Sequence, residues 1–166
     1  MSNQPRTPSS SLVPPSQLIG VDPALEQGWP VLPGYVGRVT AKAGHIDEFN
    51  HVNNLVYPQW ALEAAWHHST LLGFPFSKIK EGGIGFVIAR HEFDYKGAVL
   101  EGDEVLVATW ISANDKRLRM TRDYEMRLAN SGKLVFRGQT FFITIDMASG
   151  KAVRMPKAFI EAYVSA

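Results

Sequence analysis

The stretch NLVYPQWALEAAWHHSTLL, residues 54–72, decides the fold. It is dense in Leu, Ala and Trp; Gly73, a typical C-cap residue, follows it, and Pro75 then blocks any continuation of a helix. Pro58 is tolerated only in a first turn, so the spacing predicts a helix that starts between residues 54 and 57. Apolar residues lie on most faces of this helix: Val56, Trp60, Leu62, Ala64, Trp66 and Leu71. A helix that is apolar nearly all round is predicted to be buried.

Outward from this helix, the chain has the pattern of strands joined by short turns. One strand is expected before the helix and four after it, at residues 35–42, 84–95, 103–113, 117–129 and 133–145. The strand at 117–129 alternates apolar and polar residues, which indicates one buried face and one face that is wet or at an interface. Pro156 opens a short terminal helix, expected at 157–164. Short turns favour antiparallel pairing, and one antiparallel sheet around one buried helix is an α+β arrangement.

The composition is that of one ordinary globular domain, with 166 residues, 45% apolar and 20% charged. A net charge of +1 gives no footprint for nucleic acid. The chain contains no cysteine, which excludes a disulfide framework, a thiolate zinc site and a cysteine nucleophile. No apolar run reaches the roughly 20 residues of a membrane span, and no signal peptide is recognised, so we expect no membrane partner and a cytoplasmic location.

Residues 1–34 hold most of the prolines, separated by serines and glutamines. Such a stretch buries too little apolar surface to offset the cost of ordering, so we expect a disordered or draped N-terminal arm. Leu18, Ile19 and Trp29 are the residues of this arm that could dock. The folded domain is expected at 35–166.

The segment HIDEFNHVNNLVYPQW, residues 45–60, carries the chemistry. It packs two histidines, one aspartate and three asparagines into ten residues, between a strand and the helix: His45, Asp47, Asn50, His51, Asn53 and Asn54. Loops between rigid elements are where functional groups concentrate. The alternative is that Asn53 or Asn54 merely caps the helix. The spacing of the histidines and the aspartate matches no common metal-ligand signature, so we expect no metal.

This pattern, Asp-x-x-(Gly/Asn)-His-Val-Asn-Asn-x-x-Tyr-x-x-(Trp/Tyr), resembles the motif of hot-dog acyl-CoA thioesterases of the 4-hydroxybenzoyl-CoA thioesterase type. It also resembles the motif of plant acyl-ACP thioesterases. The matching positions are Asp47, Asn50, His51, Val52, Asn53, Asn54, Tyr57, Trp60 and, less specifically, Glu63. The resemblance implies a hot-dog fold, in which a curved antiparallel sheet wraps around a central helix. It also implies hydrolysis of an acyl-CoA or acyl-carrier-protein thioester, with coenzyme A present only as part of the substrate.

The resemblance also assigns roles to these residues. Asp47 would activate water as a general base or attack the thioester carbonyl directly. Backbone N–H groups around Asn53 to Val56, with Asn54 among them, would hold the oxyanion at the start of the helix. His51 would orient Asp47 or the water, or assist the leaving thiolate. The supporting positions are His45, Asn50, Asn53, Tyr57 and Glu63.

Three details qualify these roles. Asn50 stands where the family has Gly, and Asn tolerates the positive φ that the turn needs. Glu63 is a second carboxylate candidate, although an ordinary helix acid is the favoured interpretation. Many family members carry two acids, as Asp-x-Asp, where this chain has His45 and Asp47. The loss of the first acid favours a second hypothesis, a non-hydrolytic acyl-CoA-binding or regulatory protein; a hot-dog hydratase or dehydratase is a third.

The remaining expectations concern the substrate and the partner. The phosphates of coenzyme A suit the forked geometry of arginine, and the candidates are Arg90, Arg117, Arg119 and Arg122, with a solvated strand face as the alternative. We expect the acyl pocket to be lined by Trp60, Trp66 and Phe86. His67 and His68 are explained by the dipole at the end of the helix. A lone curved sheet leaves its edges and outer face exposed, and the resemblance implies that sheets pair into a dimer, so a homodimer or homotetramer is expected.

Overall fold

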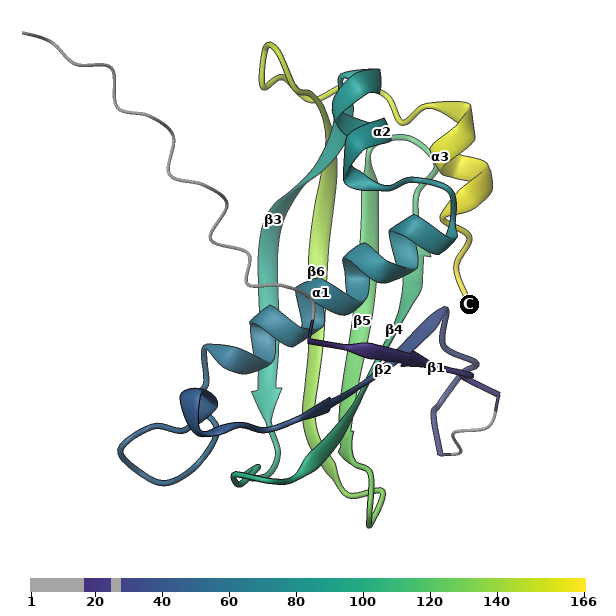
Figure 1. Cartoon of the computed structure of the whole chain (residues 1–166). Helices are drawn as coiled ribbons and strands as arrows, with labels where there is room; N and C mark the ends of the chain where they lie inside the picture. The colour runs from purple at the N-terminus through teal and green to yellow at the C-terminus, as the bar shows by residue number, and fades with distance from the viewer. Residues whose placement is uncertain (1–16, 25–27) are drawn as a thin grey trace, which may run out of the picture.

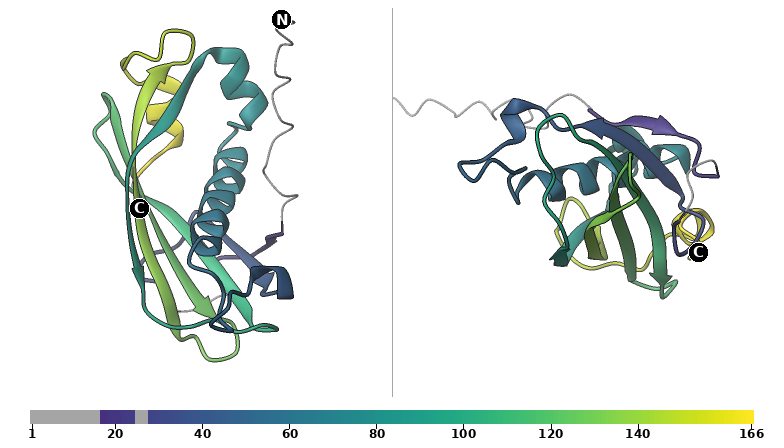
Figure 2. Two further views of the ribbon diagram at one scale, coloured as in Figure 1. Left: turned by 90° about the vertical axis from the view of Figure 1, so that its left-hand side faces the viewer. Right: turned by 90° about the horizontal axis from the view of Figure 1, so that it is seen from below.

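The strand meander predicted after the helix is present in the computed structural model, which describes residues 17–24 and 28–166. Within these residues six strands form one antiparallel sheet in the order β1-β2-β4-β5-β6-β3. The strands are β1 (Ile19–Val21), β2 (Tyr35–Thr40), β3 (Ile84–Tyr95), β4 (Glu104–Asn114), β5 (Arg119–Leu128) and β6 (Leu134–Asp146). The helices are the 3-10 turn η1 (Ala43–His45), α1 (Val56–Leu71), α2 (Phe76–Gly82) and α3 (Lys157–Ala162). The sheet curves around α1, which lies along its concave face (Figures 1 and 2).

The ends of α1 follow the predicted punctuation. The helix begins at Val56 and places Pro58 in its first turn. At the other end Gly73 takes a φ of 87°. The Gly73 N–H donates to the Thr70 carbonyl at 3.0 Å, and the Phe74 N–H donates to the Ser69 carbonyl at 2.8 Å. This pair of hydrogen bonds is a Schellman motif, which satisfies carbonyls that the helix end would otherwise leave unpaired.

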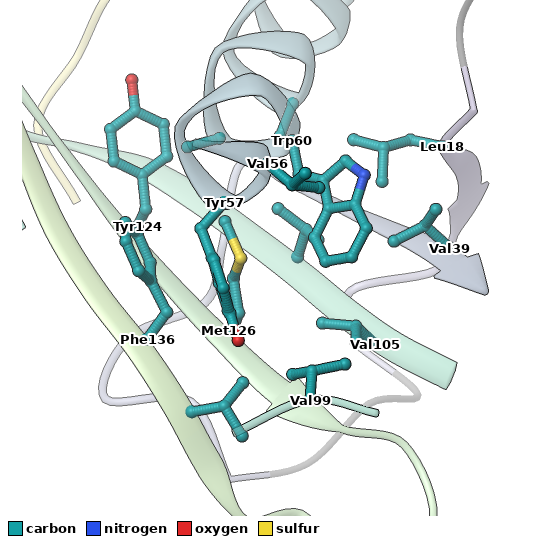
Figure 3. Close-up of a cluster of buried hydrophobic side chains, with 14 of the residues drawn as sticks. Leu18, Val39, Val56, Tyr57, Trp60, Val99, Val105, Tyr124, Met126 and Phe136 are labelled. Carbon is teal, nitrogen blue, oxygen red and sulfur yellow. The ribbon is translucent and has the colours of Figure 1, made fainter. Parts of the chain in front are cut away.

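The main core lies between α1 and the concave face of the sheet (Figure 3). Tyr57 and Trp60 of α1 pack there against residues of β2, β4, β5 and β6, namely Val39, Val105, Val107, Tyr124, Met126 and Phe136. The opposite side of α1 is not buried in the single chain, because Trp66 is 44% exposed and Leu71 is 69% exposed. The prediction of a helix buried all round is therefore right only for the side that faces the sheet.

Part of the expected N-terminal arm belongs to the sheet. Ile19 to Val21 pair with β2, and Leu18 is buried in the main core. The predicted docking of Leu18 is confirmed, whereas Ile19 is exposed. The boundary between an arm at residues 1–34 and a domain at 35–166 stays a prediction. The prediction for residues 1–16 and 25–27 lies outside the described residues.

A second, smaller core lies on the other face of the sheet. Alternate residues of β2 and β4 point away from α1 and form a buried cluster: Val36, Leu106, Ala108 and Trp110. The segment that leads into β2 covers this cluster with Trp29 and Val31, and the Arg127 guanidinium lies 5.1 Å from the centre of the Trp29 ring. The predicted docking of Trp29 is thus confirmed, on the convex face.

The alternation along β5 corrects one prediction. Arg122 was grouped with Arg90, Arg117 and Arg119 as a residue of a solvated or phosphate-binding face. It has the same parity as Met120 and Tyr124, points to the concave side and is only 1% exposed. Period-two geometry decides the direction of a strand residue, whatever its charge.

Candidate active site

The loop before α1 is a small hairpin centred on Asp47. The Asp47 N–H donates to the His51 carbonyl at 2.9 Å, and the Asn50 N–H donates to the Asp47 carbonyl at 3.0 Å. Inside this turn the Asp47 Oδ1 accepts a hydrogen bond of 2.9 Å from the Phe49 N–H. Asn50 has a φ of 61°, as its place in the motif predicts. The turn fixes the backbone of Asp47 and leaves its carboxylate half exposed in front of the helix.

The start of α1 offers fewer free donors than the sequence predicted. The Asn53 N–H donates to the His45 carbonyl, the Leu55 N–H to the Asn53 Oδ1, and the Val56 N–H to the Asn53 carbonyl. Asn53 therefore closes the turn that precedes the helix, but the N-cap residue is Leu55 and no side chain caps it, so the interpretation of Asn53 or Asn54 as the helix cap is not confirmed. Among the described residues, the N–H groups of Asn54 and Tyr57 have no such partner, and Pro58 has no N–H. These two groups are the oxyanion donors that the local structure leaves available.

Tyr57 and Tyr95 line the space beside the helix start. Tyr57 stacks on Phe136 with ring centroids 5.5 Å apart, and the Tyr95 ring meets it edge-on at 5.4 Å. The Tyr95 hydroxyl donates to the Asn54 carbonyl at 2.9 Å. Burial is the main cause that raises the pKa of Tyr57, and the charge of Asp47 acts in the same direction. The sequence did not indicate Tyr95 as a site residue; it lay in the run Phe93 to Ala98, which resembles the strand and turn that follow the helix in the family.

His45, His51 and Glu63 do not share one cluster with the Asp47 carboxylate. His51 is exposed and meets Asp47 through its backbone carbonyl. The His45 Nδ1 accepts a hydrogen bond from the Lys42 N–H, and its ring lies edge-on to Trp60. Burial, with the charge of Lys42, lowers the pKa of His45. These contacts make His45 a local structural residue.

Glu63 faces the N-terminal arm. Its Oε1 accepts hydrogen bonds from the N–H groups of Gln17 at 2.6 Å and Leu18 at 3.0 Å. This carboxylate therefore anchors the arm to α1, which agrees with the favoured interpretation of an acid without a catalytic role.

The candidate phosphate ligands Arg90 and Arg119 lie on β3 and β5, and Arg117 lies in the turn before β5. Arg90 pairs with Glu92 at 2.5 Å and lies over the Phe141 ring at 4.4 Å. Arg117 and Arg119 are exposed, and their N–H groups donate to Asp115 where β5 begins. Coenzyme A binding by these arginines stays a prediction.

A cavity of about 230 Å³ opens between the second half of α1, α2 and the sheet. Its apolar walls include Leu62, Trp66, Phe76, Phe86, Ile88, Met120 and Phe142, and its polar residues are Ser69, Arg122 and Tyr163. Trp66 and Phe86 line it as predicted. Trp60 does not, because it packs in the main core instead.

His68 lies beside Arg122 and is buried, so the helix dipole does not explain it as the sequence suggested. The Arg122 Nη1 lies 2.7 Å from the His68 Nδ1 and 3.4 Å from the Thr109 Oγ1. Burial, reinforced by the Arg122 charge, lowers the pKa of His68 to about 3. At neutral pH the imidazole is therefore uncharged, and its Nδ1 accepts from the guanidinium.

This pair predicts an acid-sensitive fold. The unfolded chain takes up a proton at His68 near pH 6.5, and the folded chain only near pH 3. The stabilisation is complete above the higher value and is lost as the pH falls toward the lower one. Between pH 7 and pH 4 we expect His68 to cost roughly 3 kcal/mol of the free energy of unfolding. Urea unfolding at several pH values would measure it. His68→Asn keeps a hydrogen-bond acceptor that does not titrate, so it should remove this part of the dependence of the unfolding free energy on pH. If the wild type and His68→Asn lose stability equally between pH 7 and pH 4, the prediction is wrong.

Neither a metal nor a membrane span is indicated in the described part of the chain. No group of three or more His, Cys, Asp or Glu residues there is arranged to hold a metal ion. No helix within residues 17–24 and 28–166 combines the length and the apolar composition that crossing a membrane requires.

Solved structures of other proteins share this arrangement of sheet and central helix. A 1,4-dihydroxy-2-naphthoyl-CoA thioesterase from Synechocystis superposes with a TM-score of 0.70 at 21% identity, covering 77% of this chain and 93% of that one. A DHNA-CoA thioesterase from Staphylococcus aureus gives 0.69 at 24%, covering 76% and 83%. A 12:0-ACP thioesterase from Umbellularia californica gives 0.70 at 16%, covering 79% and 54%. At these identities the likeness establishes the fold, which is the hot-dog fold.

The sequence itself matches a family. No curated protein sequence matches the chain. Residues 41–163, however, match the thioesterase-like superfamily, and this range includes the Asp47 hairpin, α1 and all four strands that follow it. The chain therefore belongs to the thioesterase-like superfamily.

Proposed function

We propose that this protein is a thioesterase that hydrolyses an acyl-CoA to the free acid and coenzyme A. The observation that carries the proposal is the Asp47 carboxylate, held in a tight turn directly before a helix whose first free N–H groups are those of Asn54 and Tyr57. Asp47 takes a proton from water as the water attacks the thioester carbonyl. The oxyanion accepts hydrogen bonds from the free N–H groups and is favoured by the helix dipole. The C–S bond then breaks, and the thiolate leaves.

The likeness to solved structures supports this class of substrate. Two of the similar proteins are named as CoA thioesterases and one as an ACP thioesterase. An acyl-carrier-protein thioester is therefore the alternative substrate. No cofactor is required by the proposed step, since water and the carboxylate supply the nucleophile and the base.

Thiol release measured with DTNB tests the function. Purified protein is incubated with a panel of acyl-CoAs that differ in chain length, ring and charge, and with one acyl-carrier protein. We expect release well above the uncatalysed rate for at least one acyl-CoA. Calorimetric binding of acyl-CoAs without any release would instead favour a non-hydrolytic binding protein, the hypothesis that His45 in the place of an acid supports.

We also propose that the protein works as a homodimer in the cytoplasm. β3 is an edge strand of 12 residues, and within the described chain it pairs only with β6. Two of its apolar residues are exposed, Val87 at 40% and Ile88 at 42%. A long unpaired edge of this kind favours pairing with a second copy. A tetramer would need a further interface.

The dimer would complete the site. The cavity begins at Leu62, and α1 is about 24 Å long at 1.5 Å per residue, so a cavity beside its second half is far from its own Asn54. An antiparallel pair of β3 strands places the start of one beside the end of the other. The start of β3, at Gly85 to Ile88, lines the cavity, whereas its end, at Tyr95, contacts Asn54. The pairing therefore brings the cavity of one protomer toward the helix start of its partner.

Ala89→Pro should separate the dimer. Ala89 lies at the bulge in β3 and has no partner residue in β6, so a proline there removes an N–H without costing a pair inside the protomer. Light scattering after size exclusion should show the wild type at twice 18.4 kDa and the variant at 18.4 kDa. Ala89→Thr keeps the N–H and should remain dimeric. A monomeric wild type at micromolar concentration would contradict the interface.

A further inference from the structure

The floor of the cavity carries a positive charge that has no acidic partner. Arg122 is 1% exposed, and its Nε makes no hydrogen bond. Its guanidinium contacts are the neutral His68 and, at 3.4 Å, the Thr109 hydroxyl. Among the described residues no carboxylate lies within ion-pair distance of it. Glu125, the buried acid of the same strand, points to the opposite face, where Arg127 and Arg137 each bind it through two N–H groups.

Apart from Ser69 and Tyr163, the other residues that line the cavity are mainly apolar, and the cavity runs from an exposed end to a buried one. Its outer residues are partly exposed, with Trp66 at 44% and Ile88 at 42%, whereas Arg122 and Tyr163 are each 1% exposed. A ligand that enters beside Ile88 would pass apolar walls such as Phe86 and Phe142 and end at the guanidinium. A buried charge is costly unless it is paired, so the chemistry that completes this floor is an anion.

We propose that this cavity binds an acyl group whose far end is a carboxylate, and that Arg122 is the residue that selects it. The proposal rests on the proposed function, since it names the substrate class of that same site: CoA thioesters of short dicarboxylic acids. A carboxylate suits the two-pronged donor geometry of arginine. The volume of about 230 Å³ lies below the ~300–1,000 Å³ of sites for drug-sized ligands and so fits a short acyl group. His68 holds the guanidinium in place as a positioning residue.

Two non-hydrolysable thioethers test the proposal without relying on turnover. S-(5-carboxypentyl)-CoA carries a terminal carboxylate, and S-hexyl-CoA ends in a methyl group at the same chain length. Calorimetry on the wild-type protein should show the carboxylated ligand binding about 10- to 100-fold more tightly, the value of one charge-assisted pair. Arg122→Met should abolish this preference by weakening the carboxylated ligand, and Arg122→Lys should retain part of it. Arg154→Met, which removes an exposed charge, should leave the ratio unchanged.

Three outcomes overturn the inference. Equal binding of the two thioethers by the wild type would mean that the Arg122 charge does not select for the terminal carboxylate. A preference that survives Arg122→Met would mean that the carboxylate binds elsewhere. An arginine with a purely structural role would weaken both ligands alike. If Arg122→Met does not fold, the wild-type ratio and Arg122→Lys decide. Turnover of adipoyl-CoA and hexanoyl-CoA is measured separately: a binding preference without hydrolysis refutes the thioesterase proposal and supports the assignment of the cavity.

Discussion

Asp47→Asn should lower kcat/KM for thioester hydrolysis by roughly 10²–10⁴-fold, the usual contribution of a general base. The amide cannot take a proton from water, but its oxygen can still accept the hydrogen bond from the Phe49 N–H that holds the turn. The loss should therefore be chemical and not structural. Steady-state DTNB kinetics on the best acyl-CoA of the panel would measure it, with the unfolding midpoint in urea as a check on the fold.

Glu48→Gln is the matched control for this experiment. Glu48 is the next residue along the same turn, it is exposed, and neither of the hydrogen bonds of the Asp47 backbone involves it. The Glu48→Gln substitution removes the same charge from nearly the same place, so a general electrostatic effect on the rate would appear in both variants. If Asp47→Asn keeps its rate, or if Glu48→Gln loses as much, another group is the base.

Gly34→Ala should be the most damaging of the glycine-to-alanine substitutions, because its added Cβ meets the closest neighbour. A Cβ on Gly34 would lie 2.1 Å from the Nε2 and 2.2 Å from the Cε1 of His68. The His68 ring is buried and bonded to Arg122 on its other side, so it has no free direction in which to move. Displacing it leaves the buried guanidinium without its closest acceptor. We expect a loss of about 3–5 kcal/mol from the free energy of unfolding, the range for leaving a buried charge uncompensated.

The size of this loss matters because a domain of this size has only about 5–15 kcal/mol of stability in all. Urea unfolding at pH 7 measures it, with Gly82→Ala as the control. Gly82 lies in α2, and a Cβ there would meet nothing within 4 Å. A glycine in a helix is less favourable than alanine by about 1 kcal/mol, so the control should be neutral or slightly stabilising. Equal midpoints for Gly34→Ala and wild type would show that the ring can move freely.

The sequence predicted the bounds of an element best where glycine, proline or a turn marks its ends. Residues 84–95 were predicted as a strand and are β3 without an error in either end, because the β-forming run is bounded by glycine on one side and a turn on the other. Helix α1 was predicted from Pro58 and Gly73 for similar reasons. The strand β1 and the helix α2 were missed. β1 exists because three residues of a proline-rich segment find the edge of β2, which is a tertiary event.

The site was harder to predict than the fold, for a physical reason. The motif identified Asp47 and the turn at Asn50, but the hydrogen bonds that leave only the N–H groups of Asn54 and Tyr57 free depend on distances. Arg122 was assigned to the wrong face of the sheet because its charge was given more weight than its position in the alternation along β5. His68 was misplaced because its partner is 54 residues away in the sequence.

The cover on the convex face sets a limit on how dimers could associate further. Trp29 and Val31 already occupy the apolar surface over β2 and β4, and Arg127 is engaged between Trp29 and Glu125. Two sheets could not stack back to back over this half of the molecule without first displacing that segment. A higher assembly could instead use the outer side of α1, where Trp66 and Leu71 are exposed, and its formation would then depend on the helix surface.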